Sequence, residues 1–140
     1  MQITSASDFL SISKSGADTF NLTTDIDFHD TEFVPQVFAG TFQGNGHTLR
    51  NINISRADEE GSVFYGVFSN LCADVNISNL LVENVYIRYI NYDASFIQQV
   101  SIGCVIGSAY GAVLENVTLN TCSILTAGNM NIRQMGGLVG

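Results

Sequence analysis

The sequence has few basic residues and almost no proline. Its 140 residues include 5 Lys and Arg and 1 Pro, against 13 Asp and Glu, which gives a formal charge of −8. Phosphate contacts need clustered Lys and Arg, so we do not expect this chain to bind nucleic acid directly. The same sign of charge disfavours attachment to anionic lipid. It favours a basic partner instead.

Long apolar runs are also missing. No stretch approaches the roughly 18 apolar residues of a membrane span, so we expect no membrane insertion. The first ten residues, MQITSASDFL, lack the basic start and apolar run of a signal peptide.

Cysteine is scarce and carries no metal-ligand pattern. The three residues, Cys72, Cys104 and Cys122, are odd in number and form no CxxC pair. We interpret them as small buried apolar side chains, and we expect no metal and no cofactor. A bridge between Cys104 and Cys122 stays open, because pairing cannot be read from spacing.

What the chain does contain is typical of a turn-rich β protein. Apolar residues make up 46% and charged residues 13%, about half the usual share of roughly 25%. There are 13 Gly, and Asn is equally frequent. The length fits one domain, so we treat residues 1–140 as a single all-β unit.

A degenerate repeat is the strongest signal in the sequence. Residues 77–85 match residues 114–122 at an offset of 37, and residues 102–107 are echoed by residues 135–140. Within each unit apolar residues alternate with polar ones, which indicates strands. The pattern predicts a short right-handed parallel β-helix of about three to four coils over residues 41–140. Residues 1–40 are expected to form an N-terminal cap and the first strands.

Two local features refine this prediction. Residues 7–13 form the one helix candidate, with Ser5 or Ser7 as its cap. The repeated Asn79 and Asn116 are expected to bond to each other in an inward-facing ladder, and Asn also tolerates the left-handed backbone that corners require.

Three segments resemble a known family. They are GTFQGNGHTL at 40–49, FNLTTDIDF at 20–28 and GGLVG at 136–140. Together they are similar to the GLUG-motif family of β-helical, adhesin-like surface proteins of bacteria and phage. The resemblance implies a β-helix and, less specifically, a large secreted or surface-anchored parent protein that usually has no known activity.

Two acidic groups are candidate contact residues. Asp25, Asp27, Asp30 and Glu32 lie within eight positions and could bind Ca²⁺, but the EF-hand spacing is absent. We interpret them as cap residues that satisfy turn amides. We interpret the second group, Asp58, Glu59 and Glu60, as a solvated loop or as a protruding acidic loop that contacts a basic partner.

The remaining candidates are aromatic and basic. Four aromatic residues, Tyr86, Tyr89, Tyr92 and Phe96, cluster with Arg88 in one tyrosine-rich insertion. The cluster is either core and loop packing or a contact patch, since Tyr and Arg are frequent in interface hot spots. His47 lies in a glycine turn and is expected to be structural, and His29 is a weaker site candidate.

Two functions follow from these features. The first is a non-catalytic binding module that presents an acidic face to a protein partner or a glycan, at the cell surface if it belongs to an adhesin-like protein. The alternative is an acidic inhibitor that mimics nucleic acid and blocks a basic nucleic-acid-binding enzyme in a host cytoplasm, as phage anti-CRISPR and other anti-defence factors do. An enzyme is not expected, because β-helix enzymes that act on polysaccharides need about seven or more coils for their groove. An open last coil predicts a homo-oligomer formed end to end, or through residues 130–140.

Overall fold

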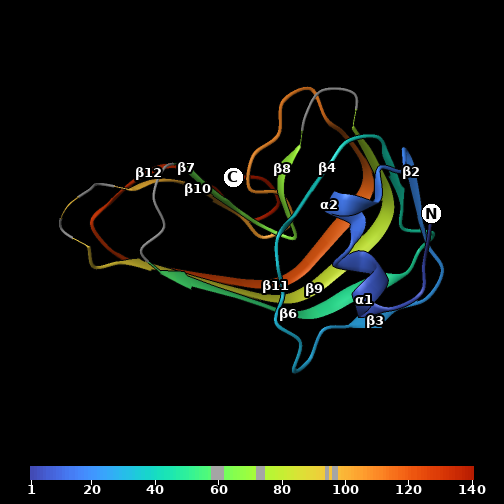
Figure 1. Cartoon of the computed structure of the whole chain (residues 1–140), viewed down its shortest axis with the longest axis horizontal. Helices are drawn as coiled ribbons and strands as arrows, with labels where there is room; N and C mark the ends of the chain where they lie inside the picture. Colours follow the sequence, from blue (N-terminus) through green and yellow to red (C-terminus); the bar gives the residue numbers. More distant parts are fainter. Residues whose placement is uncertain (58–61, 72–74, 94, 96–97) are drawn as a thin grey trace.

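The computed structural model describes residues 1–57, 62–71, 75–93, 95 and 98–140, and most of its regular structure is strand (Figure 1). The prediction of an all-β chain is confirmed. The strands are β1 (Gln2–Ile3), β2 (Thr19–Leu22), β3 (Ile26–Asp27), β4 (Gln36–Phe38), β5 (Thr41–Gln43), β6 (Thr48–Ala57), β7 (Ser62–Tyr65), β8 (Phe68–Leu71), β9 (Asn76–Asn91), β10 (Gln98–Gly103), β11 (Val113–Gly128) and β12 (Met130–Gly136). Two single-turn helices, α1 (Ala6–Phe9) and α2 (Ile12–Ser15), lie near the N-terminus.

Every strand pairing among the described residues is parallel, and the strands form three sheets. The largest, here the long sheet, has the order β1-β2-β5-β9-β6-β3, with β11 on the other edge of β9. Strands β5 and β6 follow each other along the chain and both pair with β9, so they lie end to end beside it. The other two sheets are β12-β10-β7 and β4-β8.

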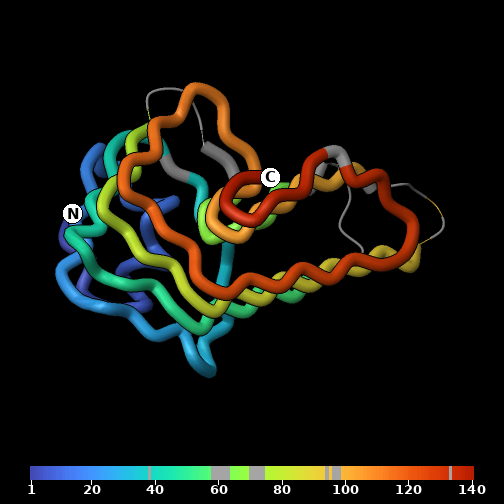
Figure 2. The backbone as a smooth tube through the Cα atoms, turned by 180° about the vertical axis from the view of Figure 1, so that it is seen from behind, coloured from blue at the N-terminus to red at the C-terminus, as the bar shows by residue number. Residues whose placement is uncertain are grey.

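The chain returns repeatedly to the long sheet, and we call each return a pass. From β6 it runs through β7 and β8 to β9, and from β9 through β10 to β11, so that β6, β9 and β11 lie side by side (Figures 1 and 2). Isolated bridges join Phe68 to Ile106 and Ile106 to Val139, so successive passes also meet beyond the three-stranded sheet. The predicted 37-residue offset is confirmed, since Asn76 pairs with Val113.

Left-handed residues set corners within β6, β9 and β11. In β9 the alternation of inward side chains is interrupted twice, at Asn79 (φ 53°) and Asn84 (φ 55°). At each position two residues instead of one separate consecutive buried side chains, because the left-handed residue turns the strand. The inward residues of β9 are all buried: Ile77, Leu80, Val82, Val85, Ile87 and Tyr89.

The predicted asparagine ladder exists but faces the opposite way. Asn116 donates its Nδ2 to Oδ1 of Asn79 at 2.9 Å, yet both residues are exposed. The inward placement is therefore wrong, because a left-handed corner residue of a convex turn points its side chain into solvent. The second half of the prediction holds, since both residues have φ 53°.

The N-terminal segment closes one end of the core. The ring of Phe9 lies 5.5 Å from Phe28, 5.9 Å from Phe42 and 5.8 Å from Phe68, measured between centroids. The single helix expected over 7–13 is instead two separate turns, α1 and α2. Ser5 caps α1 by accepting a hydrogen bond from the Asp8 amide, as one of the two expected caps.

Close backbone contacts and a disulfide also connect segments of the chain that lie outside the three sheets to their neighbours. A Cβ on Gly107 would lie 2.5 Å from the carbonyl oxygen of Ser69, so only glycine fits there. Cys104, buried as predicted, is bonded to Cys122, and this answers the question that the spacing left open. Cys72 lies outside the described residues. No helix in the described part of the chain is long and apolar enough to cross a membrane.

Candidate functional site

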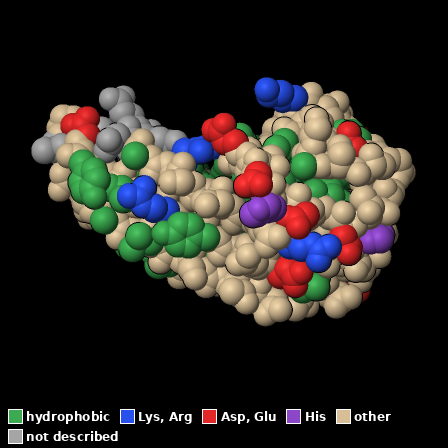
Figure 3. Space-filling view, turned by 90° about the horizontal axis from the view of Figure 1, so that it is seen from below, with side chains coloured by type: hydrophobic (Ala, Val, Ile, Leu, Met, Phe, Trp, Pro, Cys, Tyr) green, Lys and Arg blue, Asp and Glu red, His purple; other side chains and the backbone are tan. Residues whose placement is uncertain are grey.

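The outer face of the long sheet carries two regions of different chemistry. Acidic, histidine and arginine side chains gather at one end of this face, and apolar side chains with arginine at the other (Figure 3). We call the first region, built on β3, β6 and β9, the charged row. The second, built on the later halves of β9 and β11, is the Tyr86 patch, made of Tyr86, Arg88 and Leu125.

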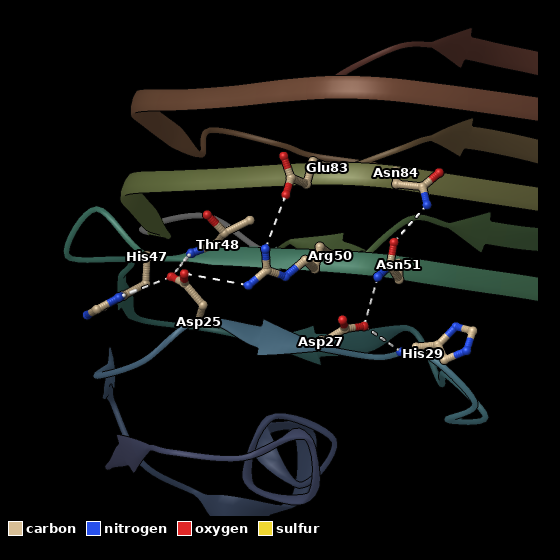
Figure 4. Close-up of polar contacts among 9 residues, drawn as sticks. All are labelled: Asp25, Asp27, His29, His47, Thr48, Arg50, Asn51, Glu83 and Asn84. Atoms are coloured by element: carbon tan, nitrogen blue, oxygen red, sulfur yellow. Dashed lines mark hydrogen bonds and ion pairs between the residues drawn. The ribbon is translucent and has the colours of Figure 1, made fainter.

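The charged row runs across adjacent strands (Figure 4). Asp25 Oδ1 accepts a hydrogen bond from the Thr48 amide at 2.9 Å and lies 3.2 Å from His47 Nδ1. Arg50 lies between two carboxylates, with 3.7 Å from Nη2 to Asp25 and 3.7 Å from Nη1 to Glu83. Parallel pairing places Arg50 directly opposite Glu83.

These contacts stabilise the charged form of Asp25. The hydrogen bond from the Thr48 amide, with smaller contributions from His47 and Arg50, holds the pKa of Asp25 below its ordinary value of 3.8. The Arg50 and Asp25 side chains are 39% and 47% exposed, so water and salt screen their attraction. Such exposed pairs contribute about 0–1 kcal/mol each, which makes the row a surface feature more than a source of stability.

A second ladder begins at Asp27. Asn84 donates Nδ2 to Oδ1 of Asn51 at 2.7 Å, and Asn51 donates Nδ2 to Asp27 at 2.9 Å. This bond and one from the His29 amide lower the pKa of Asp27. Asp25 and Asp27 thus satisfy turn and corner groups, in agreement with their interpretation as cap residues.

The other acidic candidates lie beside this ladder. Asp30 and Glu32 are exposed, and together with His29 they line a shallow open hollow that Asn51 also borders. His29 Nε2 lies 3.3 Å from Asp30, with both side chains largely in solvent. In the described part of the chain, no three His, Cys, Asp or Glu side chains come close enough to hold a metal ion. Asp58, Glu59 and Glu60 lie outside the described residues.

Of the aromatic candidates, Tyr89 is buried and Tyr92 is exposed. Tyr89 is 0% exposed and packs against Tyr65, with ring centroids 5.4 Å apart, so its prediction as a contact residue is wrong. It follows Val85 and Ile87 at alternate positions and therefore points inward. Tyr92 is 72% exposed, so its role as a contact residue stays a prediction. Phe96 lies outside the described residues.

Arg88 lies on the outer face with Tyr86, two residues earlier on the same strand. Parallel pairing sets Arg88 beside Leu125, and Tyr86 and Leu125 are 37% and 47% exposed. Within the part of the chain that the structure describes, Arg88 makes no ion pair. The patch thus combines a cation with aromatic and aliphatic surface on a rigid sheet.

Comparison with known proteins gives one partial match. The chain is 31% identical over 105 residues, 75% of its length, to a segment of Halomucin from Haloquadratum walsbyi. It spans about 1% of the length of that protein. No family model matches the chain, and no solved structure matches it.

Sequence reasoning missed three residues of these two regions, Arg50, Glu83 and Leu125. Tyr86 belonged to the predicted tyrosine-rich insertion, and its outward position agrees with alternation, because it lies between the buried Val85 and Ile87. The pairing of Arg50 with Glu83 needed the 33-residue register of β6 on β9, which differs from the 37-residue offset visible in the repeat.

Proposed function

We propose that the chain is a four-pass segment of a parallel β-helix and acts as a non-catalytic module that binds a protein partner through the Tyr86 patch. The fold part is supported by the parallel register, the repeated route through three sheets and the left-handed corner residues at matching positions. The GTFQGNGHTL and GGLVG segments support it further through their resemblance to GLUG-motif proteins.

The Tyr86 patch is the observation that carries the binding role. Arg88 is a cation without an ion pair in the described chain, although the protein has a formal charge of −8. Tyr and Arg are the residues that interface hot spots favour, and an exposed Leu125 beside them adds apolar area. A partner with a carboxylate near an apolar surface would satisfy all three side chains. The rigid sheet beneath them keeps the entropy cost of binding small.

The mimicry alternative has weaker support. A nucleic-acid mimic needs rows of free carboxylates at regular spacing. On the long sheet, Asp25 and Glu83 instead contact Arg50, and Asp27 accepts bonds from Asn51 and the His29 amide. Positive and neutral groups thus interrupt the acidic row.

A pull-down tests the proposal. The full chain is immobilised and exposed to bacterial lysate, and bound proteins are identified by mass spectrometry after washes at low and moderate salt. We expect a captured protein to be lost with Tyr86→Ser and with Arg88→Ser. Tyr110→Ser is the matched control, because Tyr110 is 82% exposed and lies away from the patch in sequence.

Each other outcome argues against the proposal. Capture that survives both patch variants would place the contact elsewhere. Capture of a nucleic-acid-binding protein that is lost with Asp25→Asn and with rising salt, but not with Arg88→Ser, would support the mimic instead.

A further inference from the structure

The two ends of the stacked passes differ. At the N-terminal end α1 and α2 cover the core, and Phe9 and Ile12 are buried there. At the other end β11 is the last strand of the long sheet, and its inward side chains are only partly covered. These are Leu114, Val117, Leu119, Cys122 and Ile124, whereas their β9 neighbours Ile77, Leu80, Val82, Val85 and Ile87 are 2% exposed or less.

The outer edge of β11 is long, and its backbone N–H and C=O groups pair with no other strand of the described chain. The strand pairs with β9 over residues 113–128, and its opposite edge pairs with no strand among the described residues. Proteins protect such edges with charges, proline or short strands. The sequence of β11, VLENVTLNTCSILTAG, contains one charged residue, Glu115, and no proline.

The hydrogen bonds of both asparagine ladders run in one direction, from the later strand to the earlier one. Each later asparagine donates Nδ2 to Oδ1 of the earlier one, as Asn84 does to Asn51 and Asn116 does to Asn79. In the described chain Oδ1 of Asn116 accepts no hydrogen bond, so the acceptor that a following asparagine would use is vacant.

From these observations we infer that the free edge of β11 binds an extended polypeptide segment with the repeat pattern of this chain, added as a further parallel strand. Such a segment places Asn or Gly at the corner level of Asn116, followed by apolar residues level with Val117 and Leu119. It would cover the half-exposed inward side chains and extend the β9–β11 interface by one layer. The inference rests on the β-helix part of the proposed function and not on the Tyr86 patch.

A second copy stacked head to tail does not fit this edge as well. The strands that it would offer, β1 and β3, have two residues each, and α1 and α2 close the core behind them. The exposed Asp25 and Asp27 sit at the same end. The charge and the short strands both oppose docking of that end against β11.

A peptide of residues 113–128 with Cys122→Ser, labelled with a fluorophore, is the probe. Its binding to the full chain is measured by fluorescence anisotropy, and hydrogen exchange of the chain is compared with and without the peptide. We expect saturable binding at micromolar concentration and slower exchange in β11 but not in β1 and β2. The matched control peptide also carries Val117→Asp and Leu119→Asp, and it should bind at least about tenfold more weakly, since carboxylates cannot enter the apolar layer.

Three results would overturn the inference. The first is no binding by a chain that circular dichroism shows to be folded, and the second is protection away from β11. The third is protection of β11 without peptide that grows with protein concentration while light scattering reports a dimer, which would assign the edge to a second copy. None of these results bears on capture through Arg88, so the two proposals fail separately.

Discussion

Replacing Thr121 with asparagine should stabilise the protein. Thr121 is a β-branched residue held at φ 63°, at the level of Asn84 in β9 and Asn51 in β6. Left-handed backbone costs an ordinary L residue about 1–2 kcal/mol, and asparagine pays less of this cost than a branched side chain. Thr121 is therefore less suited to the left-handed backbone of this corner than the asparagines at the same level of the two earlier passes.

The substitution also extends a ladder. In Thr121→Asn the new Nδ2 can donate to Oδ1 of Asn84, as Asn84 donates to Asn51 at 2.7 Å. One net hydrogen bond is worth about 0.5–1.5 kcal/mol, and an exposed one lies at the low end of that range. The bond that is lost, from Thr121 Oγ1 to Asn120 Oδ1, is long at 3.5 Å. Together the two effects give an expected gain of about 1–2 kcal/mol in the free energy of unfolding.

Urea denaturation followed by far-UV circular dichroism measures this gain as a higher midpoint with an unchanged slope. Thr118→Asn is the matched control, since Thr118 is an exposed threonine of the same strand without a positive φ, and its change should be near zero or slightly destabilising. Thr121→Gly isolates the backbone contribution, because it relieves φ without offering a hydrogen bond. A Thr121→Asn midpoint at or below that of the Thr118 control would refute the corner argument.

Three further predictions concern other parts of the fold. Gly107→Ala should destabilise the protein by more than about 2 kcal/mol in the same urea assay, because its Cβ would meet backbone at 2.5 Å, whereas Gly137→Ala has only a contact at 3.9 Å and should change little. Reduction of the disulfide, which spans 18 positions, should lower the free energy of unfolding by about 3 kcal/mol, and an unchanged midpoint in dithiothreitol would contradict it. The lowered pKa values of Asp25 and Asp27 mean that their stabilising contribution is complete above pH 3.8 and is lost as pH falls through the lowered values. Acid titration of Asp27→Asn should therefore show a shallower loss of stability than the parent chain.

Much of the fold could be predicted because its signals are local. The interval of two residues between Leu49 and Ile52, with Asn51 inside it, predicts a corner, and the same interval around Asn84 repeats it. What the pattern did not give was the side on which a corner residue lies. A left-handed residue shifts the phase of alternation, and the asparagines at these corners face solvent. Tyr89 faces the core because it alternates with Val85 and Ile87, a local signal that its prediction as a contact residue set aside.

The outer-face regions could be predicted less well, because they depend on register. Arg50 and Glu83 meet at an offset of 33, and Arg88 and Leu125 meet at 37. A single repeat length cannot place both pairs. Charged residues close in sequence, such as Asp30 and Glu32, were easy to notice, but contacts across strands form between residues far apart in the chain.

The unequal length of the passes has a consequence for how this protein can change. Thr19 pairs with Thr41 after 22 positions, Thr41 with Asn76 after 35, and Asn76 with Val113 after 37. The same sheet therefore accepts neighbours whose connecting segments differ greatly in length, because the strands and corners alone must match. A sequence inserted between two strands would therefore be presented at a position set by those strands. The loops can diverge, or be engineered, while the core stays unchanged.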